Sequence, residues 1–338
     1  MVYLRIFCVH AAFAAFLVLG SQAAAQNVED GLSQLQESCA KEPDPELRIE
    51  ACSGILPLLA DKPALSKEEK RRLIAFAQLQ IGMTYFLYDL HPSIPAYGIR
   101  HINRAVGVDP NYAEAHYARA SVLYLQRKKF PRDPIQGALE SVSTFIELEP
   151  DDVLGYKLRS SILRSLGNYT SAADDATRAI ALAPDDPHAF ELRGHALNRS
   201  GTYARAVRDF DAAKSHGSNS RMIHQARGFA HMKVGNLDQA LNDLNIAITQ
   251  SEYIGLRHFR GLVHQKRGDA ENAIKDWTAV LKDNPKVFIE QWQIRLRGGG
   301  FWSGRIDGRN SADLRRAIKG CAHDPGCGDI WDDMEFGL

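Results

Sequence analysis

The 338-residue sequence contains none of the short motifs that mark common catalytic centres. It has no H-E-x-x-H pair for zinc, no G-x-S-x-G nucleophile turn and no phosphate-binding loop. The three glycines at 298–300 follow a helical pattern rather than a strand, so they indicate the exit of a helix. We therefore expect a protein that is not an enzyme and that needs no cofactor.

An excess of charge of either sign is also missing. The 41 lysines and arginines are balanced by 41 aspartates and glutamates, so the formal net charge is zero. Because proteins that bind polyanions usually carry a basic excess, we expect no nucleic-acid partner.

Long apolar runs are absent except at the start of the chain. There, Arg5 precedes an apolar run at 6–19, and the small residues Ala23 and Ala25 form an A-x-A pattern before Gln26. This order is typical of a secretory signal peptide over residues 1–25. An uncleaved anchor is the alternative, but the run is too short for a span. We expect cleavage, a periplasmic or secreted protein, and no membrane span afterwards.

Cysteine is scarce, and after removal of the signal peptide it occurs as two local pairs. Cys39 lies near Cys52, and Cys321 lies near Cys327. An even number of cysteines in an oxidising compartment favours disulfides. A metal site would need the distant pairs to converge, and redox catalysis would favour a C-x-x-C spacing, which is missing. We predict two structural bridges and no metal.

The dominant positive feature is a repeat of 34 residues that begins at Val153 and continues to about residue 285. Position 8 of each copy is small and position 15 is glycine, which is typical of two close helices joined by a tight turn. The position-8 residues are Ser160, Gly194, Gly228 and Gly261, and the position-15 residues are Gly167, Gly201, Gly235 and Gly268. Each copy therefore predicts a helix hairpin that buries its apolar face only by stacking.

The landmarks of the second copy are Gly194, Tyr203, Ala206, Phe210 and Ala213. This pattern resembles the tetratricopeptide repeat family. The resemblance implies an all-α, right-handed solenoid of antiparallel hairpins. It further implies a concave groove that holds a protein or peptide partner, without catalysis.

The domain organisation follows from the repeat. We predict a helical hairpin at 26–62 and a continuous solenoid at 63–286 with about six repeats, of which the first two are irregular. The remaining residues, 287–338, would form a capping helix and a further segment.

Two charged positions recur in the repeat. Arginine occupies position 7 and aspartate occupies position 23, and a lone charge on an inward-leaning position is costly. We predict a structural ladder of Arg–Asp pairs within each hairpin or to the next one; solvated surface arginines are the alternative. The residues are Arg159, Asp175, Arg193, Asp209, Arg227, Asp243, Arg260 and Asp276.

The resemblance also places a partner groove on the first helix of each hairpin, at positions 5, 9, 12 and 13. The mixture is moderately basic with aromatic residues, which suits an extended peptide or an acidic segment. A merely hydrated face is the alternative. The candidates are Tyr117, Tyr124, Lys157, Arg164, Glu191, His195, Asn198, Arg199, Gln225, Phe229, Lys233, His258 and Lys266.

The C-terminal segment has a second, partial resemblance. The residues Phe301, Trp302 and Asp307-Gly308, with Gln293 before them, resemble part of a peptidoglycan-binding domain. The glycine-proline signal of that family is missing, and Asp307-Gly308 equally fits a plain turn. The sequence thus predicts an exported scaffold for a protein or peptide partner; the alternative is a cell-wall-associated protein, with peptidoglycan bound by this segment.

Overall fold

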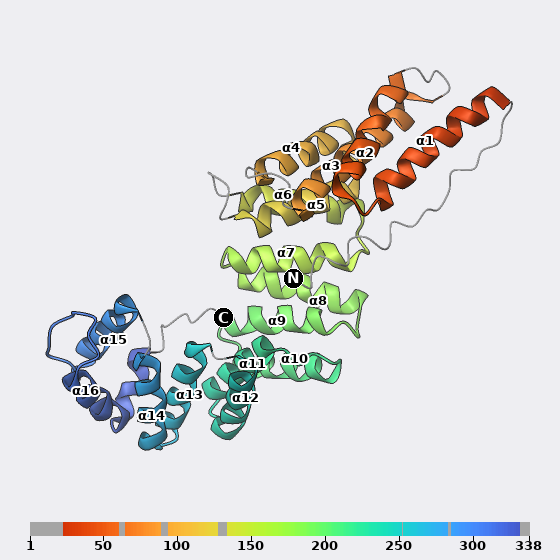
Figure 1. The fold of residues 1–338 in the computed structure, drawn as a ribbon. Helices are drawn as coiled ribbons and strands as arrows, with labels where there is room; N and C mark the ends of the chain where they lie inside the picture. Colours follow the sequence, from red (N-terminus) through yellow and green to blue (C-terminus); the bar gives the residue numbers. More distant parts are fainter. Residues whose placement is uncertain are drawn as a thin grey trace. The chain divides into compact units, whose positions relative to one another are not determined.

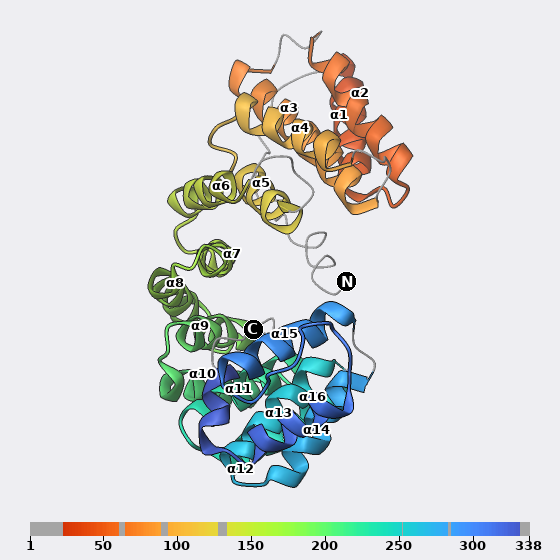
Figure 2. The ribbon, with the colours of Figure 1, turned by 90° about the vertical axis from the view of Figure 1, so that its left-hand side faces the viewer.

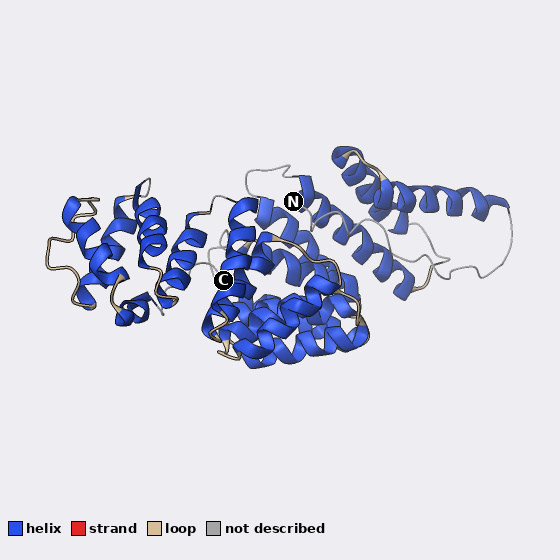
Figure 3. Ribbon diagram, turned by 90° about the horizontal axis from the view of Figure 1, so that it is seen from below, coloured by secondary structure: helices blue, strands red, loops and turns tan. Residues whose placement is uncertain are grey.

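The computed structural model describes residues 23–60, 65–88, 94–127, 134–251, 253–282 and 285–331. Most of the predicted signal peptide, residues 1–22, lies outside the described residues. Within the described ranges the regular elements are all helices, as Figure 3 shows. None of these helices is both long enough and apolar enough to cross a bilayer. The all-α class predicted from the repeat is confirmed.

The chain forms two compact units, Met1–Ile162 and Leu163–Leu338. In unit 1, neighbouring helices along the chain pair as antiparallel hairpins (Figure 1). Its helices are α1 (Ala23–Lys41), α2 (Pro45–Ala60), α3 (Lys67–Tyr88), α4 (Ile94–Val108), α5 (Ala113–Leu125) and α6 (Ile135–Leu148), followed by most of α7 (Val153–Ser165).

A reciprocal glycine contact brings α3 and α4 together. A Cβ atom on Gly82 would lie 2.7 Å from the carbonyl oxygen of Gly98, and one on Gly98 would lie 2.9 Å from that of Gly82. Any larger residue at either position would push the two helix axes apart.

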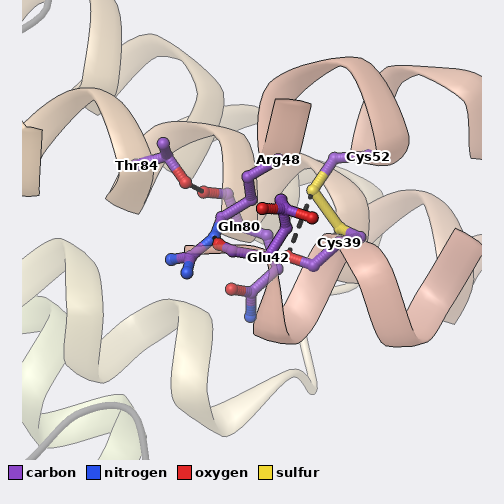
Figure 4. Close-up of a disulfide and its surroundings, with 6 residues drawn as sticks. All are labelled: Cys39, Glu42, Arg48, Cys52, Gln80 and Thr84. Atoms are coloured by element: carbon purple, nitrogen blue, oxygen red, sulfur yellow. Dashed lines mark hydrogen bonds between the residues drawn. A yellow bond between two sulfur atoms is a disulfide. The ribbon is translucent and has the colours of Figure 1, made fainter. Parts of the chain in front are cut away.

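The first hairpin is closed by the Cys39–Cys52 disulfide, whose Cα atoms are 4.7 Å apart (Figure 4). Both cysteines are fully buried. Beside them, Arg48 Nε donates a hydrogen bond of 2.6 Å to the carbonyl oxygen of Glu42, which fixes the turn between α1 and α2. The bridge therefore joins two helices that are already packed together.

Unit 2 begins with the end of α7 and continues the hairpin pattern (Figure 2). Its further elements are α8 (Tyr169–Leu182), α9 (Pro187–Arg199), α10 (Tyr203–Ser215), α11 (Arg221–Lys233), α12 (Leu237–Gln250), α13 (Ile254–Lys266), α14 (Ala270–Lys282), α15 (Lys286–Gly298), α16 (Ala312–Ala322) and the 3₁₀ helix η3 (Pro325–Trp331).

The turns within the hairpins have the predicted geometry. The glycines at repeat position 15 all adopt left-handed backbone conformations, with φ between +78° and +83°, which suit glycine. The glycines at position 8 also bring the first helix close to its partner: a Cβ atom on Gly194 would lie 2.8 Å from the Phe210 ring, and one on Gly261 would lie 2.4 Å from the Trp277 indole. The close approach expected from small residues is thus confirmed.

Capping residues set several helix starts. The side chain of Asp186 accepts from the N–H of His188 at the start of α9, next to Pro187 at the first helical position. Ser220 caps α11 and Ser311 caps α16 in the same way. These contacts satisfy backbone donors that the helix itself leaves unpaired.

Helices α15, α16 and η3 gather beside the last hairpin (Figures 1 and 2). The predicted capping helix is α15, and its Trp292 is fully buried against Trp277 of α14. Helix α16 packs on α14 as well, with Leu314 and Ile318 buried. The end of the solenoid is therefore covered by a small assembly rather than by a single helix.

Candidate functional site

The arginines at repeat position 7 connect successive hairpins. Arg227 donates two parallel hydrogen bonds to Asp243 of its own hairpin, 2.8 Å from Nε and 2.6 Å from Nη2. Its third nitrogen, Nη1, donates a hydrogen bond of 2.6 Å to Asp211 on the second helix of the preceding hairpin. One guanidinium thus ties three helices together, and its planar fork suits the bidentate contact.

The same arrangement recurs at two other arginines of unit 2. Arg193 donates two hydrogen bonds to Asp209 (2.8 and 2.8 Å) and one to Thr177 of the preceding hairpin (3.3 Å). Arg260 donates two to Asp276 (2.7 and 2.6 Å) and one to Asn245 of the preceding hairpin (2.8 Å). The sequence offered contacts within a hairpin or to the next hairpin. In the structure, Asp209, Asp243 and Asp276 pair with the arginine of their own hairpin, and that arginine also contacts the preceding hairpin.

Unit 1 repeats the backward contact with neutral partners. Arg119 donates to Asn103 (2.8 Å) and to Ser141 (2.6 Å), and Arg159 donates to Ser143 (3.5 Å). Asp175, the aspartate predicted for Arg159, is buried in α8 of unit 2.

The carboxylate of Asp243 is the most deeply buried centre of this ladder, with its side chain 1% exposed. Besides Arg227, it lies 2.8 Å from Nδ1 of His224, whose Nε2 lies 2.7 Å from Oδ1 of Asn219. Burial acts to raise the pKa of Asp243, but the hydrogen bonds from Arg227 and His224 outweigh it and hold that pKa below its usual range. His224 could not be predicted from the repeat, because the other copies carry different residues at position 4.

We call the surface formed by positions 5, 9, 12 and 13 of the first helices the first-helix face. Positions 5 and 12 mostly support the stack. Asn198 is 5% exposed and donates a hydrogen bond of 2.9 Å to the carbonyl oxygen of Ala226 on α11. Gln225 is 4% exposed and accepts a hydrogen bond of 2.9 Å from Arg221. His258 is fully buried. The groove prediction is corrected at Asn198, Gln225 and His258, because none of these side chains is open to a partner.

Positions 9 and 13 remain accessible on α9 and α11. His195 and Phe229 are half-buried at position 9, and Arg199 and Lys233 are half-buried at position 13. Lys266 is exposed at the same position of α13. Because α11 packs between α9 and α13, the position-13 cations form one basic column, made of Arg199, Lys233 and Lys266.

Aromatic rings accompany this column. The Phe229 ring lies 5.9 Å from Tyr203 and 5.8 Å from Phe259, and Lys233 Nζ lies 5.6 Å from the Phe229 centroid. Arg199 lies 5.5 Å from the Tyr169 ring. Such contacts hold the cations beside apolar surface while keeping their charge.

The charge of the face is positive at neutral pH. Burial, together with the charge of Arg164, lowers the pKa of His195 to about 3, so this imidazole is neutral. Arg164 is half-buried. The acid on this face, Glu191, accepts a hydrogen bond from the Ser218 hydroxyl. The arrangement offers cations and aromatic rings to a ligand.

Comparison with known proteins agrees with this architecture. Residues 136–220 match the model of the tetratricopeptide repeat family. A tetratricopeptide repeat protein from Parabacteroides merdae aligns with 75% of this chain and 92% of its own at 16% identity, with a TM-score of 0.52. Pseudomonas aeruginosa pilF aligns with 61% of this chain and 90% of its own at 16% identity, with a TM-score of 0.50. The fold is a tetratricopeptide-repeat solenoid. A comparison with curated proteins gave no match.

Three of the candidate residues, Tyr117, Tyr124 and Lys157, belong to unit 1. Tyr117 packs on Phe145 with 5.1 Å between centroids, and burial raises its pKa to about 12. The Tyr124 hydroxyl donates a hydrogen bond of 3.1 Å to the carbonyl oxygen of Ser161. Lys157 is half-buried on α7. The two tyrosines therefore join helices of the stack.

Gln293 organises the C-terminal segment around Asp307-Gly308, for which the sequence suggested peptidoglycan binding as an alternative; no similarity to a known protein supports that alternative. The Gln293 side chain is fully buried. Its Oε1 accepts hydrogen bonds from the backbone N–H groups of Asp307 (2.9 Å) and Gly308 (3.0 Å). Its Nε2 donates 2.9 Å to the Asp307 carboxylate. Gly308 has φ +67°, as a tight turn requires. Asp307-Gly308 thus acts as a turn, and these contacts hold the C-terminal segment on α15.

The cysteines at 321 and 327 form the second bridge, with Cα atoms 5.2 Å apart. It joins the end of α16 to η3, and both sulfurs are buried. The structure thus brings together both predicted cysteine pairs.

Proposed function

We propose that this chain is an exported scaffold that binds a protein or peptide partner on the first-helix face of unit 2. The basic column supports this proposal most directly, because three adjacent first helices place a cation at the same repeat position, and two of these cations, Arg199 and Lys233, lie beside aromatic rings. A site of this composition holds an extended segment through charge-assisted hydrogen bonds and apolar contact.

The chemistry of the face favours an acidic segment. Carboxylates would complement Arg199, Lys233 and Lys266, while Phe229 would contact the backbone or an apolar side chain of the same segment. Steering by charge would raise the association rate, and added salt would lower it.

The direct test is fluorescence anisotropy with a short labelled peptide of alternating glutamate and glycine. We expect Lys233→Glu to weaken binding by about tenfold or more, which corresponds to about 1.4 kcal/mol. Lys275→Glu is the matched control, because Lys275 is an exposed lysine on the second helix α14. Equal affinity of the two variants, or equal binding of a matched glutamine peptide, would contradict the proposal.

Export is part of the proposal. It is supported by the signal-like residues 1–25 and by the two buried disulfides, which persist in oxidising compartments. Mass spectrometry of the protein from a periplasmic fraction should give a mature chain that begins at Gln26. A full-length chain in the cytoplasmic fraction would exclude export.

A further inference from the structure

The C-terminal residues 324–331 lie on the first-helix face of α13. Gln265 Nε2 donates a hydrogen bond of 2.7 Å to the carbonyl oxygen of Asp324. Gly328 passes so close to α13 that a Cβ atom there would lie 2.9 Å from Gln265 Oε1 and 3.4 Å from Lys266 Nζ. At the far end of the segment, the Trp331 ring lies 5.0 Å from the His258 ring.

The residues contacted are those that define the face in the other hairpins. His258, Gln265 and Lys266 occupy repeat positions 5, 12 and 13 of α13. Leu262 at position 9 is 3% exposed, whereas the position-9 residues His195 and Phe229 are half-buried on α9 and α11. The position-9 residue is therefore buried on the last hairpin, whereas its counterparts on the two preceding hairpins are partly accessible.

An aromatic cage anchors the end of this segment. Trp331 is 2% exposed and lies 4.4 Å from Trp292 and 6.1 Å from Trp277, measured between ring centroids. His258 is fully buried among these three indoles. The carbonyl oxygen of Ile330 accepts a hydrogen bond of 2.9 Å from Arg295. This contact holds the backbone just before Trp331. A large aromatic anchor and a few main-chain hydrogen bonds are the usual elements of peptide recognition.

The Cys321–Cys327 bridge tethers the segment to α16, which itself packs on α14. A tether raises the effective concentration of the segment at α13, so contacts that would bind weakly in a free peptide stay formed. Without the bridge, the only covalent link from α16 to Trp331 is the chain itself.

We propose that residues 324–331 are an intramolecular ligand of the first-helix face. They cover its last hairpin at positions 5 and 12, leave Lys266 as the exposed residue of that hairpin's face, and are held in place by the Cys321–Cys327 bridge. A dithiol reductant would convert this bridge to two cysteine thiols while its own two thiols become a disulfide. The loosened segment would then expose His258 and Leu262 and lengthen the binding face by one hairpin. The competition with a partner depends on the proposed function, whereas the occupancy of α13 does not.

The occupancy is tested on the full chain by histidine footprinting with diethyl pyrocarbonate and mass spectrometry. His216, the exposed residue that directly follows α10, serves as the internal reference. We expect His258 to be protected in the unaltered protein, and its labelling relative to His216 to rise about tenfold or more in Trp331→Ala. The double variant Cys321→Ser/Cys327→Ser should raise it severalfold.

Two controls make the result decisive. Removing the other bridge by Cys39→Ser/Cys52→Ser should leave the labelling of His258 unchanged, since that pair lies in unit 1. Circular dichroism verifies that each variant keeps its helix content. Should Trp331→Ala unfold, Gln265→Ala removes the contact to Asp324 alone and should still raise the labelling. Unchanged protection of His258 in the folded variants, or full reactivity in the unaltered protein, would overturn the proposal.

A second measurement separates this proposal from the function of the face. If the segment competes with a partner, the variant without the Cys321–Cys327 bridge should bind the glutamate–glycine peptide severalfold more tightly. If that peptide binds neither protein while the footprint changes as expected, the partner chemistry is wrong and the intramolecular ligand stands. If the peptide binds equally to both, competition is excluded.

Discussion

Replacement of Asp243 by alanine tests whether the arginine ladder stabilises the stack. The carboxylate is 1% exposed and accepts hydrogen bonds from Arg227 at 2.6 and 2.8 Å, with His224 Nδ1 at 2.8 Å. Removal leaves a guanidinium and a buried imidazole without their shared anion. Breaking such a buried pair costs about 3–5 kcal/mol, of which the remaining contact from Arg227 to Asp211 recovers a part.

The assay is urea unfolding followed by tryptophan fluorescence and circular dichroism, because Trp277, Trp292, Trp302 and Trp331 all lie in unit 2. The free energy of unfolding should fall by about 3 kcal/mol or more.

The matched control is Asp238→Ala, which removes an exposed partner, 77% accessible, from Arg267 at 3.2 Å. This change should cost less than about 1 kcal/mol, as exposed ion pairs usually do. In a double-mutant cycle, Asp243→Ala combined with Arg227→Ala should cost less than the sum of the single changes. If Asp243→Ala destabilises no more than the control, the ladder contributes nothing and the reasoning is refuted.

Three further predictions concern protonation, turn geometry and the first disulfide. Burial, with the charge of Arg295 as a lesser cause, lowers the pKa of His258 to about 3. Below about pH 6.5 this histidine is therefore protonated in the unfolded chain but stays neutral in the folded one. Stability should therefore fall as the pH drops below about 6.5. His258 alone contributes about 2 kcal/mol of this loss at pH 5, and His195, whose pKa is lowered in the same way, adds its own share. His258→Gln should reduce the slope measured by urea unfolding at several pH values, and an unchanged slope would contradict the assignment. Gly201→Ala should cost about 1 kcal/mol because the backbone there has φ +78°, whereas Gly298→Ala, in open helical space, should not destabilise; equal thermal shifts would argue against the left-handed turn. Replacing Cys39 and Cys52 by alanine should lower the free energy of unfolding of unit 1 by about 3 kcal/mol, measured by guanidinium unfolding, and no change would show that the bridge constrains nothing.

The fold was predictable because its determinants repeat. Position 8 and position 15 carry small residues and glycine in every copy, so a single pattern specified the close approach of the helices and the turn between them. The Arg–Asp pairs of unit 2 were visible for the same reason. Their second contact, to the preceding hairpin, was not, since Thr177, Asp211 and Asn245 share no residue type.

The face was predicted less well than the fold. Positions 5 and 12 turn toward neighbouring first helices and are buried there, as Asn198 shows through its contact to Ala226. Burial of this kind depends on the spacing between hairpins, which no single copy encodes. The cover over His258 depends on Trp331, more than seventy residues away in the chain, and no periodic signal links the two.

Photo-crosslinking in intact cells tests whether the first-helix face binds a partner. A benzophenone amino acid at Phe229 places the probe on the first-helix face, and one at Arg208, exposed on the second helix α10, serves as the reference. We predict that the Phe229 probe captures a discrete partner, that the Arg208 probe does not, and that Lys233→Glu abolishes the capture. Equal capture at both positions, or none at Phe229, would contradict the claim that this face is the binding surface.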